Sequence, residues 1–299
     1  MSNSLLFIAC SFIWGTTWIA INYQIGEMAP ALAVAIRFSI AALILGAWCW
    51  HKRLSMRFEK HLHYKLLLLG IFFYTLDYSL LYAAQHHIIS ALLALLSSTI
   101  IYVNVVLRRI LLGKPIRMEV VIGATFGMFG IGLIFIPEFE SMSLQEGILI
   151  GLLLAMGSFL SASIGNIISE RIFDQGMPVV QVNFFAMAYS LPFTYSFALY
   201  TADTIQLPSV LSFYLALLYL AVFGSVLAFG AYMKLIQQIG SDKAAYTVLV
   251  YPLVALLIST VFEGYQWQVI SAVGVLAVLF GNAIAMGKLN TYLGLSKAR

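Results

Sequence analysis

The chain has 299 residues, of which 62% are hydrophobic and 9% are charged. Because soluble domains carry about 25% charged residues, this composition excludes a soluble protein and predicts an integral membrane protein. The formal net charge of +4 does not indicate nucleic-acid binding, since positive residues in a membrane protein are expected at the ends of its spans.

Ten apolar segments, each near the ~20 residues that a helix needs to cross about 30 Å of hydrocarbon, follow one another along the chain. They are residues 4–24, 31–50, 66–86, 88–108, 118–137, 147–168, 179–200, 210–233, 244–262 and 266–287. Short joins with glycine, proline and charged residues separate them, which leaves no soluble domain between the segments. The first segment is too long for a signal-peptide core and has no basic stretch before it, so we expect it to be retained as a span.

The first span presents one face that mixes aromatic and polar side chains. On an ideal helix this face holds Ser11, Trp14, Thr17, Trp18, Ile21 and Asn22. Trp14 lies near the middle of the span, too deep for an interfacial aromatic belt. Trp14 and Trp18 are therefore candidates for lining a cavity, and packing between helices is the alternative.

The third span contains a carboxylate at a depth where charge is costly. Asp77 lies within FYTLDYSLLYAAQHH, residues 73–87, and ionisable residues at such depth usually face a bundle interior or a wet cavity. An arc of about 140° on this helix holds Tyr74, Asp77, Tyr78, Leu81, Tyr82 and Gln85. Such an arc can bind an amine through the carboxylate and through cation–π contacts with the rings. The alternative is a structural Asp77 that pairs with Arg37 of the second span or accepts hydrogen bonds from tyrosines.

Other polar and aromatic candidates for the cavity lie on later spans: Tyr102, Asn166, Tyr246 and Tyr251. His86 and His87 point about 100° apart on a helix and have no nearby cysteine or aspartate partner, so we expect a wet helix end and no metal site. Cys10 and Cys49 both lie in apolar segments and are expected to be packing residues. No cofactor is predicted.

The distribution of Lys and Arg predicts the orientation of the chain. With a cytoplasmic N-terminus and ten crossings, 15 of the 16 Lys and Arg fall on the cytoplasmic side, and the last, Arg37, lies within the second span. The outer joins receive none of them and carry Glu27, Glu138, Glu140, Glu146, Asp203 and Glu263. Both termini are therefore expected in the cytoplasm.

A weak internal repeat divides the chain into residues 1–137 and residues 138–299, the second with a short cytoplasmic tail. At a shift of 151 residues, Ser90, Gly113, Gly123 and Gly130 fall on Ser241, Gly264, Gly274 and Gly281. Because each half has five spans, an odd number, the halves are expected to insert with opposite orientation. The predicted fold is an all-α membrane protein of two inverted five-helix repeats, with a site between them near the midplane.

Four sequence patterns together resemble one family. They are FIWGTTWIAI at the start, Pro30 followed by Arg37-Phe38, YAAQHHIISALLALL before the fourth span, and IGSDKAAYTVLVYPLVALLISTVFEG in the ninth. The sequence is similar in these patterns to the drug/metabolite transporter superfamily, specifically its ten-span EamA-type members. The resemblance implies an inner-membrane carrier with alternating access and a central cavity lined by spans one, three, four, six, eight and nine.

The two halves differ at positions that are typical of this family. The second half has a proline in the middle of its fourth span and a glutamate at the end, Pro252 and Glu263, whereas the first half has Ser97-Ser98-Thr99 and Arg108-Arg109. The tryptophan pattern of span one likewise has no counterpart in span six, where Ser161-Ala162-Ser163 stands.

The sequence predicts a secondary transporter that exports an amino acid or a related amine or zwitterion across the inner membrane, with Asp77 as the candidate for proton coupling. A multidrug or quaternary-amine carrier is the alternative. An enzyme is disfavoured because the sequence has no HExxH or GxSxG pattern, and a receptor because no lysine lies deep in a span. The expected partners are a small-molecule substrate, protons and the lipid bilayer, with no nucleic acid, and the expected assembly is a monomer or weak homodimer.

Overall fold

The computed structural model describes residues 2–24, 27–85, 87, 93, 96–136, 147–201, 208–262 and 267–287, and it is helical throughout these ranges apart from turns and short joins. A few side chains within these ranges lie outside the description: Trp18, Asn22, Pro30, Tyr82, Gln85, Ser259 and Phe262.

The helices of the first part of the chain are α1 (Asn3–Asn22), α2 (Pro30–His51), α3 (Lys60–Leu69), η1 (Gly70–Leu76), α4 (Asp77–Gln85), α6 (Thr99–Leu112) and α7 (Met118–Ile134). Those of the second part are α9 (Ile148–Phe173), α10 (Val179–Thr201), α11 (Leu211–Tyr219), η2 (Leu220–Leu227), α12 (Ala228–Ile239), α13 (Ser241–Ala244), α14 (Thr247–Phe262) and α15 (Val269–Ala285). The helices follow the predicted apolar segments, but α3, α9 and α12 extend several residues further. Hydropathy marks where the apolar stretch ends, whereas a helix continues into the polar region as long as its backbone hydrogen bonds do.

Six of these helical stretches are long and apolar enough to cross a membrane, and α7 and α15 are shorter apolar helices. The six are Asn3–Ile21, Ala31–His51, Lys60–Leu81, Ile148–Phe173, Leu211–Ile239 and Ser241–Ile258. The chain is therefore built as a multi-pass membrane protein. The total of ten spans stays a prediction.

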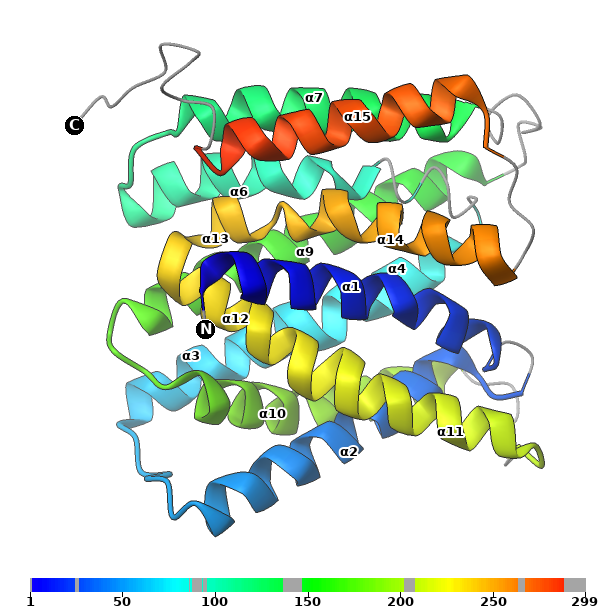
Figure 1. The fold of residues 1–299 in the computed structure, drawn as a ribbon. Coiled ribbons are helices and arrows are strands. Elements are labelled where there is room, and N and C mark those ends of the chain that lie inside the picture. The colour runs from blue at the N-terminus through cyan, green and yellow to red at the C-terminus, as the bar shows by residue number, and fades with distance from the viewer. Residues whose placement is uncertain are drawn as a thin grey trace.

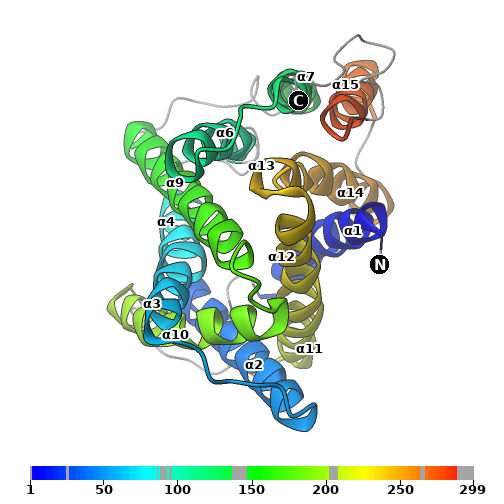
Figure 2. The same cartoon turned by 90° about the vertical axis from the view of Figure 1, so that its left-hand side faces the viewer.

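One end of the bundle carries the joins 52–59, 113–117 and 174–178, together with the start of α1 and the end of α15 (Figure 1). We call it the basic end, because these joins and the helix ends next to them hold most of the Lys and Arg assigned to the cytoplasm. Figure 2 looks at the bundle from this end.

Two π-helical segments, η1 and η2, start 150 residues apart, at Gly70 and Leu220. A π-turn widens the helix, and such turns often mark functional sites. In each segment one backbone carbonyl accepts a hydrogen bond from a side chain of another helix. Ser161 Oγ of α9 donates to the oxygen of Phe72 at 2.9 Å, and Trp14 Nε1 of α1 donates to the oxygen of Gly224 at 3.2 Å.

Helices α7 and α15 lie side by side at the edge of the bundle (Figure 2) and contact each other through glycines. A Cβ atom on Gly123 would come to 2.4 Å from the carbonyl oxygen of Gly281, and one on Gly130 to 2.5 Å from that of Gly274. The later glycine of one helix faces the earlier glycine of the other, so the two helices run antiparallel. Small residues allow this close backbone approach, which is a common means of helix association in membranes.

The orientation can be tested by cysteine labelling, because two exposed serines lie at opposite ends of the bundle. Ser55 is in the join at the basic end, and Ser209 precedes α11 at the other end. We expect Ser209→Cys to react with a membrane-impermeant thiol reagent in intact cells and Ser55→Cys to react only after lysis. The native Cys10 and Cys49 are buried and provide the background. Labelling of Ser55→Cys alone in intact cells would reverse the predicted orientation.

Candidate functional site

A cavity of about 230 Å³ lies in the centre of the bundle. Side chains from α1, α2, η1, α4, α6, α9, α12 and α14 line it, as do Leu93 and Ser97 before α6. These helices correspond to the spans expected around the cavity, one, three, four, six, eight and nine. Helix α2, which was not among the spans expected at the cavity, also contributes a lining residue, Arg37.

Five of the residues predicted from the sequence line this cavity together: Trp14, Asp77, Tyr78, Asn166 and Tyr251. Trp14 is at the centre of the aromatic part of the lining. The centroid of its ring lies 5.1 Å from that of Tyr232 and 6.4 Å from that of Tyr251. The cavity therefore has an aromatic wall next to a carboxylate.

Three predicted residues lie away from the cavity: Tyr74, Tyr102 and Tyr246. Tyr74 is fully buried, and its hydroxyl donates to Asn183 Oδ1 of α10 at 3.2 Å. The sequence placed it on the face of Asp77 by assuming 100° per residue, but Tyr74 lies in the π-helical η1, where the wider turn invalidates that angle.

The other two tyrosines hold α7 in place. Tyr246 donates to the carbonyl oxygen of Val120 at 2.7 Å, and the Tyr102 hydroxyl lies 2.9 Å from Thr125 Oγ1. Tyr246 is fully buried, and a buried tyrosine hydroxyl needs such a partner, whereas Tyr102 is half-buried. Both residues therefore contact α7 and not the cavity. The side chains of Trp18 and Tyr82 lie outside the described residues.

Asp77 begins α4 directly after η1, and its Oδ1 accepts a hydrogen bond from Ser158 Oγ of α9 at 2.6 Å. In the part of the chain that the structure describes, no cation lies within 4 Å of this carboxylate. The structural ion pair with Arg37, considered from the sequence, is therefore not formed. Arg37 instead donates from Nε to Ser225 Oγ of η2 at 2.7 Å.

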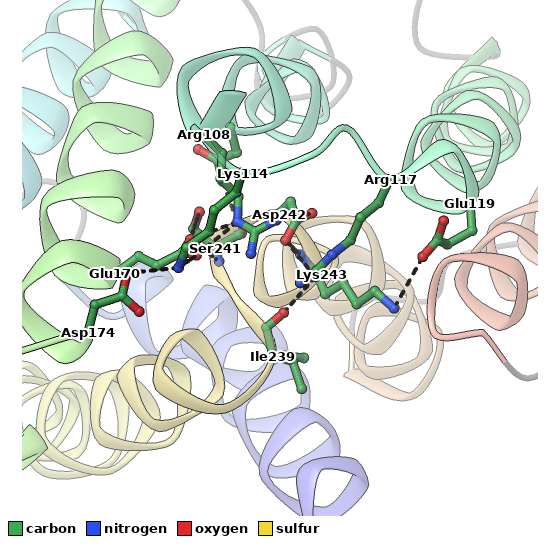
Figure 3. A network of polar contacts seen from close by, with 11 residues as sticks. Arg108, Lys114, Arg117, Glu119, Glu170, Asp174, Ile239, Ser241, Asp242 and Lys243 are labelled. Atoms are coloured by element: carbon green, nitrogen blue, oxygen red, sulfur yellow. Dashed lines mark hydrogen bonds and ion pairs between the residues drawn. The ribbon is translucent and has the colours of Figure 1, made fainter. Parts of the chain in front are cut away.

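A network of ion pairs, drawn in Figure 3, lies near the basic end of the bundle. Glu170 of α9 is at its centre and is buried. Glu170 Oε1 accepts from Arg108 Nε at 2.8 Å and from Lys114 Nζ at 2.9 Å, and Oε2 accepts from the backbone N and the Oγ of Ser241 at 2.9 and 2.6 Å. Glu170 follows the cavity residue Asn166 by one helical turn, about 6 Å along α9.

The network extends from Glu170 across three further helices. Asp242 of α13 accepts from Arg108 Nη1 at 3.4 Å and from Arg117 Nη1 at 3.1 Å. Two outer pairs complete it, Lys114 with Asp174 at 2.8 Å and Lys243 with Glu119 at 3.6 Å. The network thus joins the α6–α7 region to α9 and α13. It lies about one helical turn beyond the cavity residue Asn166, toward the basic end, and we call it the floor network.

Lys114 lies in the join outside the spans, and two opposing effects act on its pKa. Burial lowers the pKa of this ammonium group, but hydrogen bonds and attraction from Asp174 and Glu170 outweigh burial, so the pKa lies above its ordinary value. Lys114 therefore stays charged throughout the physiological range of pH.

The floor network was missed from the sequence, where Arg108 and Arg109 appeared only as a departure from the family pattern. The sequence nevertheless contains a signal for these ion pairs. Glu170 and Asp242 are acidic residues beside lysine or arginine at the ends of apolar segments on the side of the membrane predicted to be positive. Acids in that position are candidates for pairing with the basic residues around them.

Comparisons with known proteins agree with this architecture. A model of the EamA-like transporter family matches residues 1–136 and 149–287. Protein PagO of Salmonella typhimurium strain LT2 is 23% identical over 94% of this chain and 91% of its own. The protein named uncharacterized inner membrane transporter YedA, from Escherichia coli strain K12, is 26% identical over 95% of this chain and 90% of its own.

A solved structure, titled only "Crystal structure of protein", superposes with a TM-score of 0.79 over 96% of this chain and 98% of that one, at 18% identity. At this identity the likeness establishes the fold alone.

Proposed function

The chain belongs to the EamA-like transporter family, and from this we propose that it is a multi-pass inner-membrane secondary transporter that moves a small metabolite through the central cavity by alternating access. The observation that carries the proposal is the cavity itself, where a carboxylate and an aromatic wall meet in the middle of a membrane-spanning bundle. An ionisable residue at this depth marks a substrate or proton pathway by default.

Three reciprocal features support two inverted halves, residues 1–137 and 138–299. The two π-helical segments start 150 residues apart, and α1 bonds to η2 while α9 bonds to η1. Gly123 of α7 faces Gly281 of α15, and Gly130 faces Gly274, so the earlier glycine of each helix faces the later glycine of the other. Two helices related by a two-fold axis contact each other in this way. The two segments matched by the family model also divide at the same place.

Alternating access requires that one side of the cavity be closed while the other is open. We assign the floor network as the closure on the cytoplasmic side, because it bridges both halves at the basic end. Under this assignment the structure is the state closed toward the cytoplasm. Opening to the cytoplasm then requires the ion pairs of Glu170 and Asp242 to separate.

The transported molecule is proposed to be an amino acid or a related amine or zwitterion, and the direction to be export. Asp77 would receive the ammonium group, and Trp14 and Tyr251 would contact the rest of the molecule. Asp77 can hold a proton in the empty cavity and release it when a cationic group binds, which would couple the two movements. The aromatic wall with one carboxylate also suits a quaternary amine, which is the second candidate.

Variants of two tryptophans test whether the cavity is the transport site. Trp14 lines it, whereas Trp48 is 52% exposed on the outer surface of α2. We expect Trp14→Ala to weaken transport several-fold in proteoliposomes, because loss of a ring in contact with substrate removes about 0.5–2 kcal/mol. Trp48→Ala should transport like the wild type.

The assay is uptake from a panel of labelled metabolites, with size-exclusion chromatography to verify folding. Equal losses in the two folded tryptophan variants would show that the cavity is not the transport site. Failure of the wild type to move any compound in the panel would contradict the proposed function.

A further inference from the structure

Arg37 is a buried cation whose environment differs from that of Arg108, the other buried arginine among the described residues. Both Arg37 and Arg108 are 5% exposed. Arg108 contacts the carboxylates of Glu170 at 2.8 Å and Asp242 at 3.4 Å. Arg37 has no carboxylate within 4 Å among the described residues, although it lies in a membrane-spanning helix. A guanidinium without a counter-ion at this depth is costly unless a ligand supplies one.

The surroundings of Arg37 fix the guanidinium at the wall of the cavity. Its Nε donates to Ser225 Oγ, and its Cζ lies 5.7 Å from the centroid of the Phe38 ring. The π-helical η2 makes room for it at Gly224, where a Cβ atom would come to 2.9 Å from Arg37 Nη2. Only Nε is used in a hydrogen bond to the described residues, so the Nη atoms remain to bind a ligand in the cavity that Arg37 lines.

Asp77 is the corresponding anion of the cavity. It also lacks an ion-pair partner in the described ranges, and like Arg37 it is held by a serine hydroxyl, that of Ser158. Among its described lining residues, the cavity therefore contains one positive and one negative side chain that do not form an ion pair with each other. A ligand with a carboxylate and an ammonium group complements both.

We propose that Arg37 binds the carboxylate of the transported molecule and thereby restricts transport to zwitterions. The planar fork of a guanidinium matches a carboxylate through two parallel hydrogen bonds. This inference rests on the proposed function and decides between its two candidates, because a quaternary amine or polyamine has no carboxylate to offer Arg37, which lacks an anion among the described residues.

The test compares matched compounds on the purified wild type in proteoliposomes. Each competitor is an unlabelled amino acid or the amine left by its decarboxylation, and the measurement is inhibition of the uptake of a labelled substrate found in the metabolite panel. The amino acids are L-phenylalanine, L-tryptophan, L-leucine and L-methionine. We expect each amino acid that competes to do so at a concentration about tenfold or more below that of its amine, since a hydrogen bond to a charged group accounts for such a factor. A panel substrate that lacks a carboxylate, or an amine that competes as well as its amino acid, overturns the inference and leaves the transporter function intact. Absence of any substrate in the panel contradicts the function itself.

Variants then test whether Arg37 is the source of the preference for amino acids over their amines. Arg37→Met should reduce the ratio between the inhibitory concentrations of the amine and its amino acid to about one. Arg37→Lys keeps the charge but loses the planar fork of the guanidinium, so it should give an intermediate ratio. Arg109→Met removes an exposed arginine of α6 and should keep the wild-type ratio. A folded Arg37→Met that retains the wild-type ratio overturns the assignment. If Arg37→Met does not fold, Arg37→Lys and the wild-type series decide.

Discussion

The Asp77→Asn variant is expected to fold, to insert in the membrane, and to lose substrate transport or its dependence on pH. Asparagine keeps the volume of the side chain and can still accept the hydrogen bond from Ser158, which in the structure is 2.6 Å long. It cannot ionise, so it can neither attract an ammonium group nor exchange a proton. Uptake into proteoliposomes at several pH values measures both effects.

The conservative variant Asp77→Glu provides the comparison, because it keeps the charge and adds one methylene group. We expect it to retain the pH dependence at a reduced rate. An Asp77→Asn variant that transports normally, with the pH profile of the wild type, would make Asp77 a structural residue and end the coupling hypothesis.

The second large effect is expected on stability. Glu170→Gln removes the charge that Arg108 and Lys114 contact at 2.8 and 2.9 Å, and the side chain of Glu170 is only 3% exposed. Breaking a buried pair from one side costs up to about 3–5 kcal/mol. Arg108 keeps only its longer contact with Asp242 at 3.4 Å, so we expect a cost toward the lower end of this range. The thermal unfolding temperature in detergent should fall clearly.

Asp174→Asn is the matched control, since Asp174 also pairs with Lys114 but its side chain is 52% exposed. Exposed pairs contribute about 0–1 kcal/mol, so this variant should unfold near the wild-type temperature. Under the assignment of the floor network as the cytoplasmic closure, Glu170→Gln should also make the cavity more accessible from that side. Equal unfolding temperatures for Glu170→Gln and the wild type would show that the network does not hold the halves together.

The helical architecture was predictable because it depends on hydropathy, which acts over some twenty residues and tolerates local irregularity. A related reason accounts for five predicted residues that line the cavity, Trp14, Asp77, Tyr78, Asn166 and Tyr251: polar or aromatic groups in an apolar span need a specific environment. Their role in binding stays a prediction.

What could not be predicted depends on irregular backbone or on contacts between distant segments. Tyr74 lies in the π-helical η1 and outside the lining of the cavity, and no residue type in the sequence indicates a π-turn. Arg37 was considered from the sequence as a partner of Asp77, but its hydrogen-bond partner among the described residues is Ser225, 188 positions later in the chain. The floor network brings together residues from α6 to α13, so its partners are visible only in three dimensions.

The glycine contacts between α7 and α15 have a genetic consequence. A mutation that adds a methyl group at Gly123 or Gly130 places it against a carbonyl oxygen of the facing backbone. A clash with a side chain can be suppressed by a second mutation that shortens that side chain, but every amino acid carries the same carbonyl oxygen. No substitution on α15 can therefore compensate for such a mutation. Revertants are confined to restoring the glycine or to moving a whole helix, so these positions are open to far less heritable variation than a contact between leucines.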